Sequence, residues 1–269
     1  MKALILSAGQ GRRLLPLTDK CPKCTLPILG RSMIEWQIDE LSTLGIDRIT
    51  VVVGYGAEQV ERLLTKRYAG NRVKLIYNPD FAESDNLVSC WMAREEMNED
   101  FILLNGDTLF EVAVVKRLLE GPAWPLTVVT DKKITYDHDD MKVSLDGDRL
   151  VNIGKDIEPS ETDGESIGMI LFCGQGPELF RTALEKALEN PSARKKWYLS
   201  VIQEMSRSMP VWTCSINGLR WCEVDYPEDL KSAQGVVRAC ANRKERPEDS
   251  CRLDGETLSV RVDAHPQGV

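Results

Sequence analysis

The chain opens with the stretch Met1-Lys2-Ala3-Leu4-Ile5-Leu6-Ser7-Ala8-Gly9-Gln10-Gly11-Arg12-Arg13-Leu14-Leu15-Pro16-Leu17-Thr18, which is followed by Pro22-Lys23 and decides the fold class. Its apolar run is short, continuous and ends in small residues, which predicts a fully buried strand over residues 3–6. Gly9 and Gly11 come next, and because they have no side chains, their backbone N–H groups can approach an anion closely. The cations beside this loop are Arg12, Arg13 and Lys23. The stretch therefore predicts a strand that leads into a polyphosphate-binding loop.

The glycines alone leave an alternative open, which is an ordinary turn between a strand and a helix. The loop has neither the third glycine of a dinucleotide-binding fingerprint nor the G-K-[ST] ending of a P-loop. Neither of those two nucleotide-binding motifs is therefore predicted, and the loop has to be interpreted together with the residues that follow it.

Composition and charge exclude several classes of protein. A net charge of −8 over 269 residues argues against binding to nucleic acid, which depends on a basic surface that displaces counterions. No apolar stretch reaches the ~18–20 residues that a membrane span needs, and the N-terminus lacks the three-part layout of a signal peptide. With 42% hydrophobic residues, the chain can bury a sizeable core. We expect a cytoplasmic α/β protein with no membrane span and no nucleic-acid partner.

Eight cysteines are scattered through the chain, and a protein of this size does not need disulfides to fold, so we expect reduced thiols. One pattern, Cys21-Pro22-Lys23-Cys24, admits a redox dithiol or half of a zinc site as alternatives. A zinc site needs four ligands, and the sequence has two histidines and no second C-x-x-C. We interpret these cysteines as incidental neighbours of a functional lysine.

Apolar periodicity in the first half alternates between strands and helices, as is typical of βα units. Strands are predicted over residues 49–53, 73–77 and 101–104, and helices over residues 33–44, 57–68 and 86–97. Gly45 is placed to end the first of these helices, and Ser84 or Asp85 to begin the third. We therefore expect an α/β fold with a Rossmann-like, doubly wound and mostly parallel sheet.

The second half is less regular and predicts a small β-rich subregion. Strands are predicted over residues 126–131, 141–145, 150–153, 167–172, 211–216 and 221–224, and helices over residues 177–189, 197–205 and 227–239. Asp146-Gly147-Asp148 is a hairpin signal. The composition becomes polar after about residue 240. We expect one domain over residues 1–240 and a polar C-terminal tail over residues 241–269, in which residues 257–262 could form an edge strand.

Two aspartates follow predicted strands. Asp107 comes directly after a buried strand, at the carboxyl edge where open α/β sheets bind ligands, and Asp225 follows the strand over residues 221–224. Magnesium is usually bound by one or two carboxylates together with phosphate oxygens, so this pair can hold Mg²⁺ beside a triphosphate. Each aspartate also has an ordinary alternative: Asp107 can form a turn in Asn105-Gly106-Asp107, and Asp225 can cap a helix.

Together, these segments resemble the signature of nucleotidyltransferases that join a nucleoside triphosphate to a small phosphate, G-x-G-[ST]-R-L-x-P-L-T-x-x-x-P-K. Arg12 stands where that family has Ser or Thr, and Cys24 stands where proline is common. The family's metal-binding G-D is similar to Asn105-Gly106-Asp107, and its late E-[IV]-D-x-P-E-D-L is similar to the stretch from Glu223 to Leu230. The resemblance covers residues 1 to about 239.

Two further stretches narrow the resemblance within that family. Asn78-Pro79-Asp80-Phe81 and Ser84-Asp85-Asn86-Leu87-Val88-Ser89 are similar to stretches of the phosphocholine cytidylyltransferases and of relatives that act on inositol phosphate or aminoethylphosphonate. Ser84, Leu87 and Val88 differ from the aromatic residues of the choline enzymes, and a quaternary ammonium group is best held by aromatic faces. The residues that could rebuild such a cage, or else pack in the core or a lid, are Tyr136, Trp197, Tyr198 and Trp221.

The resemblance implies Mg²⁺-dependent transfer of CMP from CTP to a small phosphorylated alcohol or phosphonate, with release of pyrophosphate. Phosphocholine is the favoured acceptor, and aminoethylphosphonate or inositol phosphate comes close behind. The implied catalytic residues are Arg13 and Lys23, and the implied Mg²⁺ ligands are Asp107 and Asp225. The implied nucleotide-binding residues are Ala8, Gly9, Gly11, Arg12, Asp85, Asn86 and Gly106. The residues implied to bind the acceptor, in the β-rich subregion, are Lys155 and Glu165.

Three alternatives stay open. One is a sugar-1-phosphate nucleotidyltransferase that uses UTP, GTP or dTTP. A glycosyltransferase of similar fold would normally carry a D-x-D metal motif, whereas this chain has Asn105-Gly106-Asp107. A non-catalytic nucleotide-sensing subunit would be expected to lack one of the four central residues, and all are present: Arg13, Lys23, Asp107 and Asp225. A homo-oligomer is compatible with the sequence.

Overall fold

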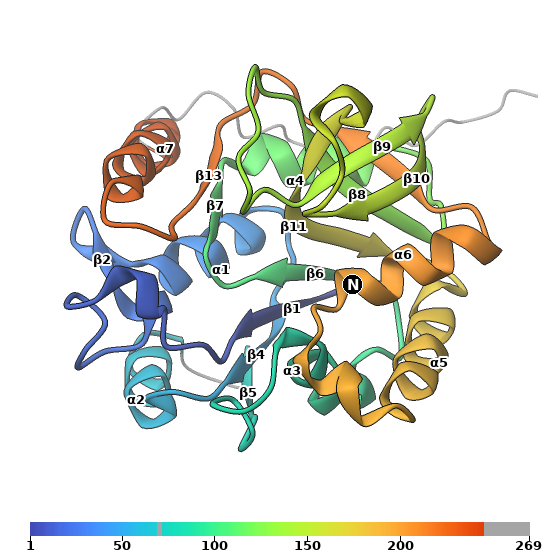
Figure 1. Ribbon diagram of the computed structural model, residues 1–269. Helices are drawn as coiled ribbons and strands as arrows, with labels where there is room; N and C mark the ends of the chain where they lie inside the picture. Colours follow the sequence, from blue (N-terminus) through green and yellow to red (C-terminus); the bar gives the residue numbers. More distant parts are fainter. Residues whose placement is uncertain (69–71, 245–269) are drawn as a thin grey trace, which may run out of the picture.

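A large sheet forms the centre of the computed structural model, which describes residues 1–68 and 72–244. The sheet has nine strands in the order β5-β4-β1-β6-β11-β8-β12-β10-β9 (Figure 1). The first four strands in this order are parallel, and they are β5 (Val73–Tyr77), β4 (Arg48–Val53), β1 (Lys2–Ser7) and β6 (Phe101–Asn105). This half confirms the predicted Rossmann-like arrangement, with the opening stretch of the chain as a buried central strand.

The other half of the sheet is mixed. It consists of β11 (Gly164–Phe172), β8 (Leu126–Asp131), β12 (Trp212–Ser215), β10 (Arg149–Gly154) and β9 (Lys142–Asp146). Strand β11 runs antiparallel to both β6 and β8, whereas β12 and β8 are parallel. The predicted hairpin is present, because β9 and β10 pair antiparallel on either side of Gly147. The sheet is therefore parallel throughout its N-terminal half and mixed beyond β6.

Helices cover both faces of the sheet, as the doubly wound prediction requires (Figure 1). The side chains of Ala3 and Ile5 pack in one apolar cluster, and those of Leu4 and Leu6 pack in another, because successive residues of a strand point to opposite faces. The first cluster includes residues of α1 (Met33–Thr43), α2 (Ala57–Arg67) and α4 (Val112–Glu120). The second includes residues of α3 (Asn86–Met92), α5 (Gly176–Leu188) and α6 (Leu199–Ser208). Among the described residues, no helix has both the length and the apolar character of a membrane span.

Some helices differ from their predicted extent. Helix α4 was not predicted, because it begins with a run of β-branched valines that favours a strand. Helix α3 ends at Met92 and continues as a 3₁₀ turn over Arg94–Glu96, which keeps the apolar spacing that predicted a longer helix. Helix α7 (Asp229–Lys244) runs past the predicted end, so the first residues of the predicted tail are helical. The rest of that tail, with the candidate strand over residues 257–262, lies outside the described residues.

A third apolar cluster joins α7 to the segment that follows the glycine loop. It contains Leu14, Leu26, Val224, Val236 and Val237. Next to it, β7 (Thr108–Phe110) pairs with β13 (Trp221–Glu223), and the backbone N–H of Val224 donates to the carbonyl of Asp107 at 3.1 Å. A short hairpin of β2 (Pro27–Ile28) and β3 (Arg31–Ser32) contacts α7 as well. These contacts bring the C-terminal segment of the described chain against the glycine loop.

Candidate active site

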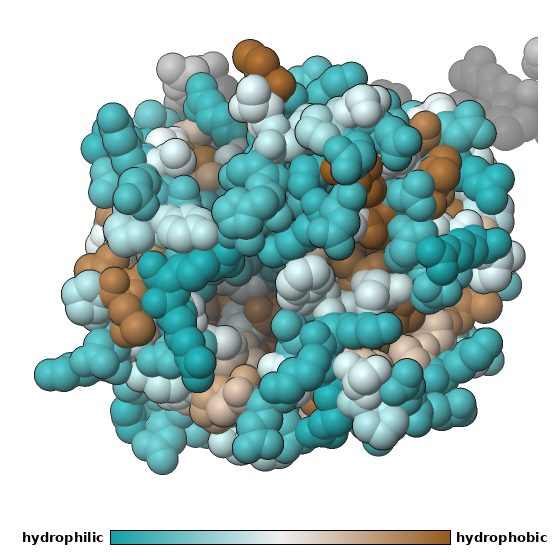
Figure 2. Space-filling model, in the orientation of Figure 1, coloured by the Kyte–Doolittle hydropathy of each residue, from teal (hydrophilic) through white to brown (hydrophobic). Residues whose placement is uncertain are grey.

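The predicted site residues gather at the carboxyl ends of β1 and β6, where two cavities adjoin. One cavity, of about 330 Å³, is lined by residues of the glycine loop and by charged side chains, among them Gly11, Arg12, Arg13, Lys23, Asp107 and Asp225. The other, of about 200 Å³, is lined among others by Ala8, Asp85 and Asn86. Gly9 and Gly106 line both cavities. Figure 2 shows a hollow near the middle of this face, rimmed mostly by hydrophilic side chains.

Lys23 joins the two aspartates that the sequence predicts as metal ligands. Its ammonium nitrogen lies 2.8 Å from Oδ2 of Asp107 and 2.6 Å from Oδ1 of Asp225. Burial alone would lower the pKa of Lys23, but the two carboxylates outweigh that effect and raise the pKa. The lysine therefore stays charged and places one positive charge between two carboxylates that lie far apart in the sequence.

A third carboxyl group, Glu223, lies beside this pair. Burial and, after it, the negative charges of Asp107 and Asp225 together raise its pKa to about 8. Glu223 was not predicted as a site residue, although it is the first residue of the late acidic motif. The site therefore concentrates acidic groups to a degree that the two aspartates alone did not indicate.

A further carboxylate of the site, that of Asp139, was also not predicted. Its Oδ2 accepts from Nη1 of Arg13 at 2.7 Å and from the hydroxyl of Tyr226 at 2.8 Å, and its Oδ1 accepts from Nζ of Lys155 at 3.1 Å. The Nη2 of Arg13 lies 2.7 Å from Oδ2 of Asp225. This carboxylate thus connects the predicted acceptor-binding lysine to the predicted catalytic arginine.

Glu165, the second predicted acceptor residue, lies in a separate charged group. Its Oε2 is 3.0 Å from Nζ of Lys133, and the same nitrogen is 2.7 Å from Oδ1 of Asp140. Burial raises the pKa of Glu165 to about 7, although the neighbouring Lys133 opposes the shift. The structure does not bring Lys155 and Glu165 into contact with each other, and each has its own charged partners.

The smaller cavity is lined by two of the predicted nucleotide-binding residues, Asp85 and Asn86. Asp85 is the N-cap of α3, and its Oδ1 accepts from the backbone N–H of Asn86 at 2.8 Å. Asn86 in turn accepts through Oδ1 from the backbone N–H of Tyr198 at 2.9 Å. Both side chains are therefore held in place by the fold while they line the cavity. The side-chain nitrogen of Asn86, Nδ2, makes no hydrogen bond to a described residue, which leaves a donor for a ligand.

The four aromatic residues considered for a cage differ in their burial and in their contacts. Tyr198 is fully buried and its hydroxyl lies 3.2 Å from Oδ1 of Asn105. Trp221 donates its indole N–H to Asp131 at 2.6 Å. Trp197 lies against Lys155, whose Nζ is 4.5 Å from the ring centroid, and Tyr136 lies 5.9 Å from Nζ of Lys133. The alternative of core or local packing therefore holds for Tyr198, and the others contact charged side chains.

The thiol of Cys24 is buried in the core, and burial raises its pKa to about 12. A thiol with this pKa is protonated and unreactive at neutral pH. Among the described residues, no group of three or more His, Cys, Asp and Glu side chains is arranged to hold a metal ion. These findings agree with the interpretation of Cys21 and Cys24 as neighbours of a functional lysine.

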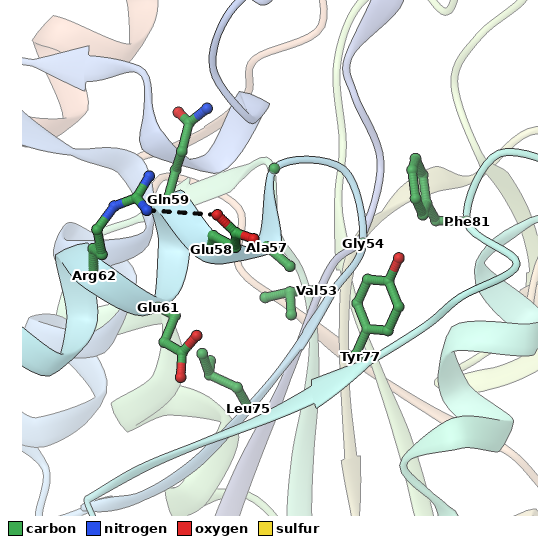
Figure 3. Close-up of a pocket in the computed structure, with 11 residues that line it drawn as sticks. Val53, Gly54, Ala57, Glu58, Gln59, Glu61, Arg62, Leu75, Tyr77 and Phe81 are labelled. Atoms are coloured by element: carbon green, nitrogen blue, oxygen red, sulfur yellow. Dashed lines mark ion pairs between the residues drawn. The ribbon is translucent and has the colours of Figure 1, made fainter.

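A further cavity of about 640 Å³ lies at the edge of the sheet, where β4 and β5 end. Figure 3 shows Tyr77 and Phe81 on one side of it and the ion pair of Arg62 and Glu58 on the other. Of the described residues that line it, none belongs to the predicted site. Phe81 also lines the smaller cavity of the site. This 640 Å³ cavity is thus a neighbour of the candidate active site and not a part of it.

Alanine should have different effects at the two glycines of the loop. Gly11 has a φ of 75°, and a Cβ there would lie 2.8 Å from Cβ of Lys23, whereas a Cβ on Gly9 meets no atom of the described chain within 4 Å. Gly11→Ala should therefore lower the free energy of unfolding by about 1–3 kcal/mol and displace Lys23. Gly9→Ala should leave stability within about 0.5 kcal/mol and raise the KM for the nucleotide, because the methyl group enters the cavity. Chemical denaturation and steady-state kinetics of both variants test this, and equal loss of stability in the two would contradict it.

Comparison with known proteins identifies the family. A family model for the MobA-like NTP transferase domain matches residues 3–196, which is more than half of the chain. The chain therefore belongs to this family of nucleoside triphosphate transferases. A solved structure, the inositol-1-phosphate CTP transferase from T. maritima, superposes with a TM-score of 0.77 at 20% identity and covers 89% of this chain and 95% of that one. This likeness shows that the two share a fold.

Curated relatives include proteins named for cytidylyl transfer. The chain is 28% identical over 241 residues to the CMP-5'-(3-aminopropyl)phosphonate synthase of Streptomyces rubellomurinus, a match that covers 87% of this chain and 38% of that protein. It is 35% identical over 111 residues to the choline-phosphate cytidylyltransferase of Streptococcus pneumoniae, covering 41% of this chain and 47% of that protein. The chain thus matches less than half the length of each of these two relatives.

Proposed function

We propose that this chain transfers CMP from CTP to a small phosphorylated or phosphonylated amine and releases pyrophosphate. The observation that carries the proposal is the convergence of Arg13, Lys23, Asp107 and Asp225 around one cavity beside a glycine loop. The family supports a nucleoside triphosphate as donor. Similarity to relatives named for a CMP-phosphonate product and for choline phosphate supports CTP and a small acceptor. A sensing subunit would have no need for all four charged residues in contact with one another.

In the proposed reaction, an anionic oxygen of the acceptor attacks the α-phosphorus of CTP. The bond from that phosphorus to the bridging oxygen of the pyrophosphate breaks, and pyrophosphate leaves with the electron pair. The attacking oxygen is already charged, so no general base is needed, and catalysis rests on positioning and charge neutralisation. Backbone N–H groups from Ala8 to Gly11 and the guanidinium of Arg13 bind the β- and γ-phosphates. Lys23 binds the α-phosphate and the incoming acceptor oxygen.

Asp107 and Asp225 fit a magnesium ion. The Oδ1 of Asp107 is buried and has no hydrogen-bond partner among the described residues, so it is available as a ligand. Two carboxylates that share one cation can exchange it for another, and Mg²⁺ is commonly held by carboxylates together with phosphates. When bound, the ion would neutralise charge that develops on the phosphates. Lys23 has a flexible stem, so it can turn from a carboxylate to a phosphate.

The carboxyl groups of Glu165, Asp140 and Asp131, which we call the acidic wall, support an acceptor with an ammonium group. Lys133 already places an ammonium nitrogen within 3.0 Å of Glu165 and 2.7 Å of Asp140, which shows that this wall accommodates a primary ammonium. Asp131 adds a buried carboxyl oxygen without a hydrogen-bond partner among the described residues. Because Tyr198 is buried and the other three candidate aromatic residues contact charged side chains, an aminoalkylphosphonate suits the wall at least as well as phosphocholine. A sugar phosphate would offer no positive charge to these carboxylates.

A pyrophosphate-release screen tests the proposed function. CTP, UTP, GTP and ATP are each combined with phosphocholine, aminoethylphosphonate, inositol phosphate and sugar-1-phosphates, with Mg²⁺ present. We expect the fastest release with CTP and an amine acceptor. Faster turnover of UTP or GTP with glucose- or mannose-1-phosphate would move the chain to sugar-nucleotide synthesis. Release of a nucleoside diphosphate instead of pyrophosphate would indicate a glycosyltransferase, and nucleotide binding without any release would indicate a sensor.

Acceptor binding should depend on pH through the titration of the Glu165 carboxyl group. Its pKa is raised to about 7, so its carboxylate is mostly protonated at pH 6 and mostly ionised at pH 8. Only the ionised form attracts an ammonium group, so the KM for an amine acceptor should fall roughly tenfold between these pH values, as the titration of one group predicts. Glu165→Gln should lose most of this dependence and keep the wild-type KM for CTP. Steady-state kinetics of both proteins from pH 6 to 8 measure it, and an unchanged pH profile in the variant would refute the role.

The raised pKa of Glu165 also predicts that the stability of the protein depends on pH. A raised pKa means that the native state holds the proton of Glu165 more tightly than the unfolded chain does. The free energy of unfolding of the wild type should therefore fall as the pH rises from about 4.5 through about 7. In Glu165→Gln this part of the pH dependence should be absent, because the amide does not titrate. Chemical denaturation at pH 5 and pH 8 gives the difference between the two proteins. The difference should move in favour of the variant at the higher pH.

A further inference from the structure

Residues 132–141, which we call the strap, connect β8 to β9 and reach the site through Asp139, which contacts Arg13 of the glycine loop. The strap has its own local structure, since Oδ1 of Asp137 accepts from the backbone N–H groups of Asp139 and Asp140 at 2.7 and 3.1 Å. Ile134 is 100% exposed. Toward the site, the strap is held by polar contacts of its charged side chains, and the carboxylate of Asp139 makes most of them.

Three donors from three separate segments converge on that carboxylate. Arg13 comes from the glycine loop and Lys155 from the end of β10, while Tyr226 comes from the segment between β13 and α7. Their distances to the oxygens of Asp139 are 2.7, 3.1 and 2.8 Å. The Nε2 of His138 lies 3.7 Å from the same Oδ2. The hydrogen bond from Tyr226, the ion pairs with Lys155 and Arg13, and their charges lower the pKa of Asp139 to about 2, so the carboxylate is ionised at neutral pH.

A guanidinium, an ammonium and a phenolic hydroxyl around one anion form a donor set that suits a phosphate group. Phosphate offers three oxygens and up to two charges, whereas the carboxylate offers two oxygens and one charge. We propose that Arg13, Lys155 and Tyr226 form one phosphate-binding site, and that Asp139 is the internal anion that fills it until a substrate phosphate replaces it.

The contacts of Arg13 support an exchangeable occupant. One nitrogen of its guanidinium contacts Asp225 and the other contacts Asp139, and Arg13 also lines the larger cavity of the site. Its side chain is 43% exposed and that of Asp139 is 25% exposed, so both can reach an entering anion. Displacement of Asp139 breaks only partly exposed ion pairs, each of which is weak. The inference depends on the proposed function only in taking the cleft to bind phosphate groups.

Binding of inorganic pyrophosphate without metal tests the inference directly. Wild type, Asp139→Asn and the double variant Asp139→Asn with Tyr226→Phe are titrated with pyrophosphate in EDTA by calorimetry. Asp146→Asn, an exposed aspartate in the β9–β10 hairpin, is the matched control for loss of one negative charge. We expect Asp139→Asn to bind pyrophosphate roughly three- to tenfold more tightly than wild type, because an internal competitor of modest strength is gone. The control should match wild type within twofold, and the added Tyr226→Phe should reverse most of the gain.

Unchanged or weaker binding by Asp139→Asn would overturn the inference and make Asp139 a residue that only positions Arg13. A gain of equal size in Asp146→Asn would overturn it too, because it would report net charge alone. Steady-state kinetics then assign the source of the phosphate: a lower KM for the acceptor places the acceptor's phosphate in the site, and a lower KM for CTP places the triphosphate there. The calorimetry uses neither CTP nor acceptor, so its outcome is independent of the substrate screen.

Discussion

Replacing Lys23 with alanine should reduce nucleotidyl transfer by a factor of several hundred or more. Lys23 is 12% exposed and contacts both Asp107 and Asp225, and it lines the 330 Å³ cavity of the site together with them. In the proposed reaction it contacts the α-phosphate and the acceptor oxygen, where charge is redistributed in the transition state. Loss of one such contact in a preorganised site costs about 3–4 kcal/mol. Single-turnover rates with saturating CTP and acceptor measure the effect.

The same substitution should make the protein more dependent on a divalent cation. Without Lys23, the carboxylates of Asp107 and Asp225 repel one another with no ammonium between them. The melting temperature of Lys23→Ala in EDTA should therefore be lower than that of wild type, and Mg²⁺ should raise it by more than it raises the wild-type value. Lys20→Ala, an exposed lysine three residues away, is the control and should change neither quantity. Turnover near the wild-type rate in Lys23→Ala would remove Lys23 from the active site.

The N-terminal half of the fold could be predicted because its signals are local. Strands such as β1 and β6 are covered on both faces, so they show as continuous apolar runs, and amphipathic helices with turns separate them. The direction and order of the later strands depend on long-range pairing, such as β11 against β6, which no local pattern records. Helix α4 was not predicted, because its valines have a weak helix propensity. Their burial against the sheet outweighs that propensity.

The site could be predicted where its residues adjoin strand ends. Lys23, Asp107 and Asp225 lie beside predicted strands or the glycine loop, and the structure brings them into contact. Asp139 was missed because its acidic, turn-rich surroundings are typical of a solvated loop, and its partners Arg13 and Tyr226 are far from it in sequence. An isolated acidic run between two strands of a cation-lined site is the signal that could have indicated it.

Asp107→Asn and Asp225→Asn should each reduce Mg²⁺-dependent transfer by roughly 10²–10³-fold while the protein stays folded, a loss of the size seen when one preorganised electrostatic contact is removed. An amide has the shape of a carboxylate, but it loses the charge that a magnesium ligand supplies. Asp225→Asn also weakens the contacts to Lys23 and Arg13, so it should have the larger effect of the two. Rates measured as a function of Mg²⁺ concentration should show no recovery to the wild-type value at saturation.

The pKa of Glu223 provides a test of these two variants by the pH dependence of their stability, which does not require activity. Its pKa of about 8 is raised by burial and then by the charges of Asp107 and Asp225, so removal of either charge should lower it. Since a raised pKa makes the native state lose stability as the pH rises through about 8, each variant should lose less stability than wild type between pH 6 and pH 9. Asp146→Asn should follow the wild-type curve, because it lies in the β9–β10 hairpin turn. A variant that keeps both the wild-type rate and the wild-type pH dependence would show that its aspartate is only a turn former or a helix cap.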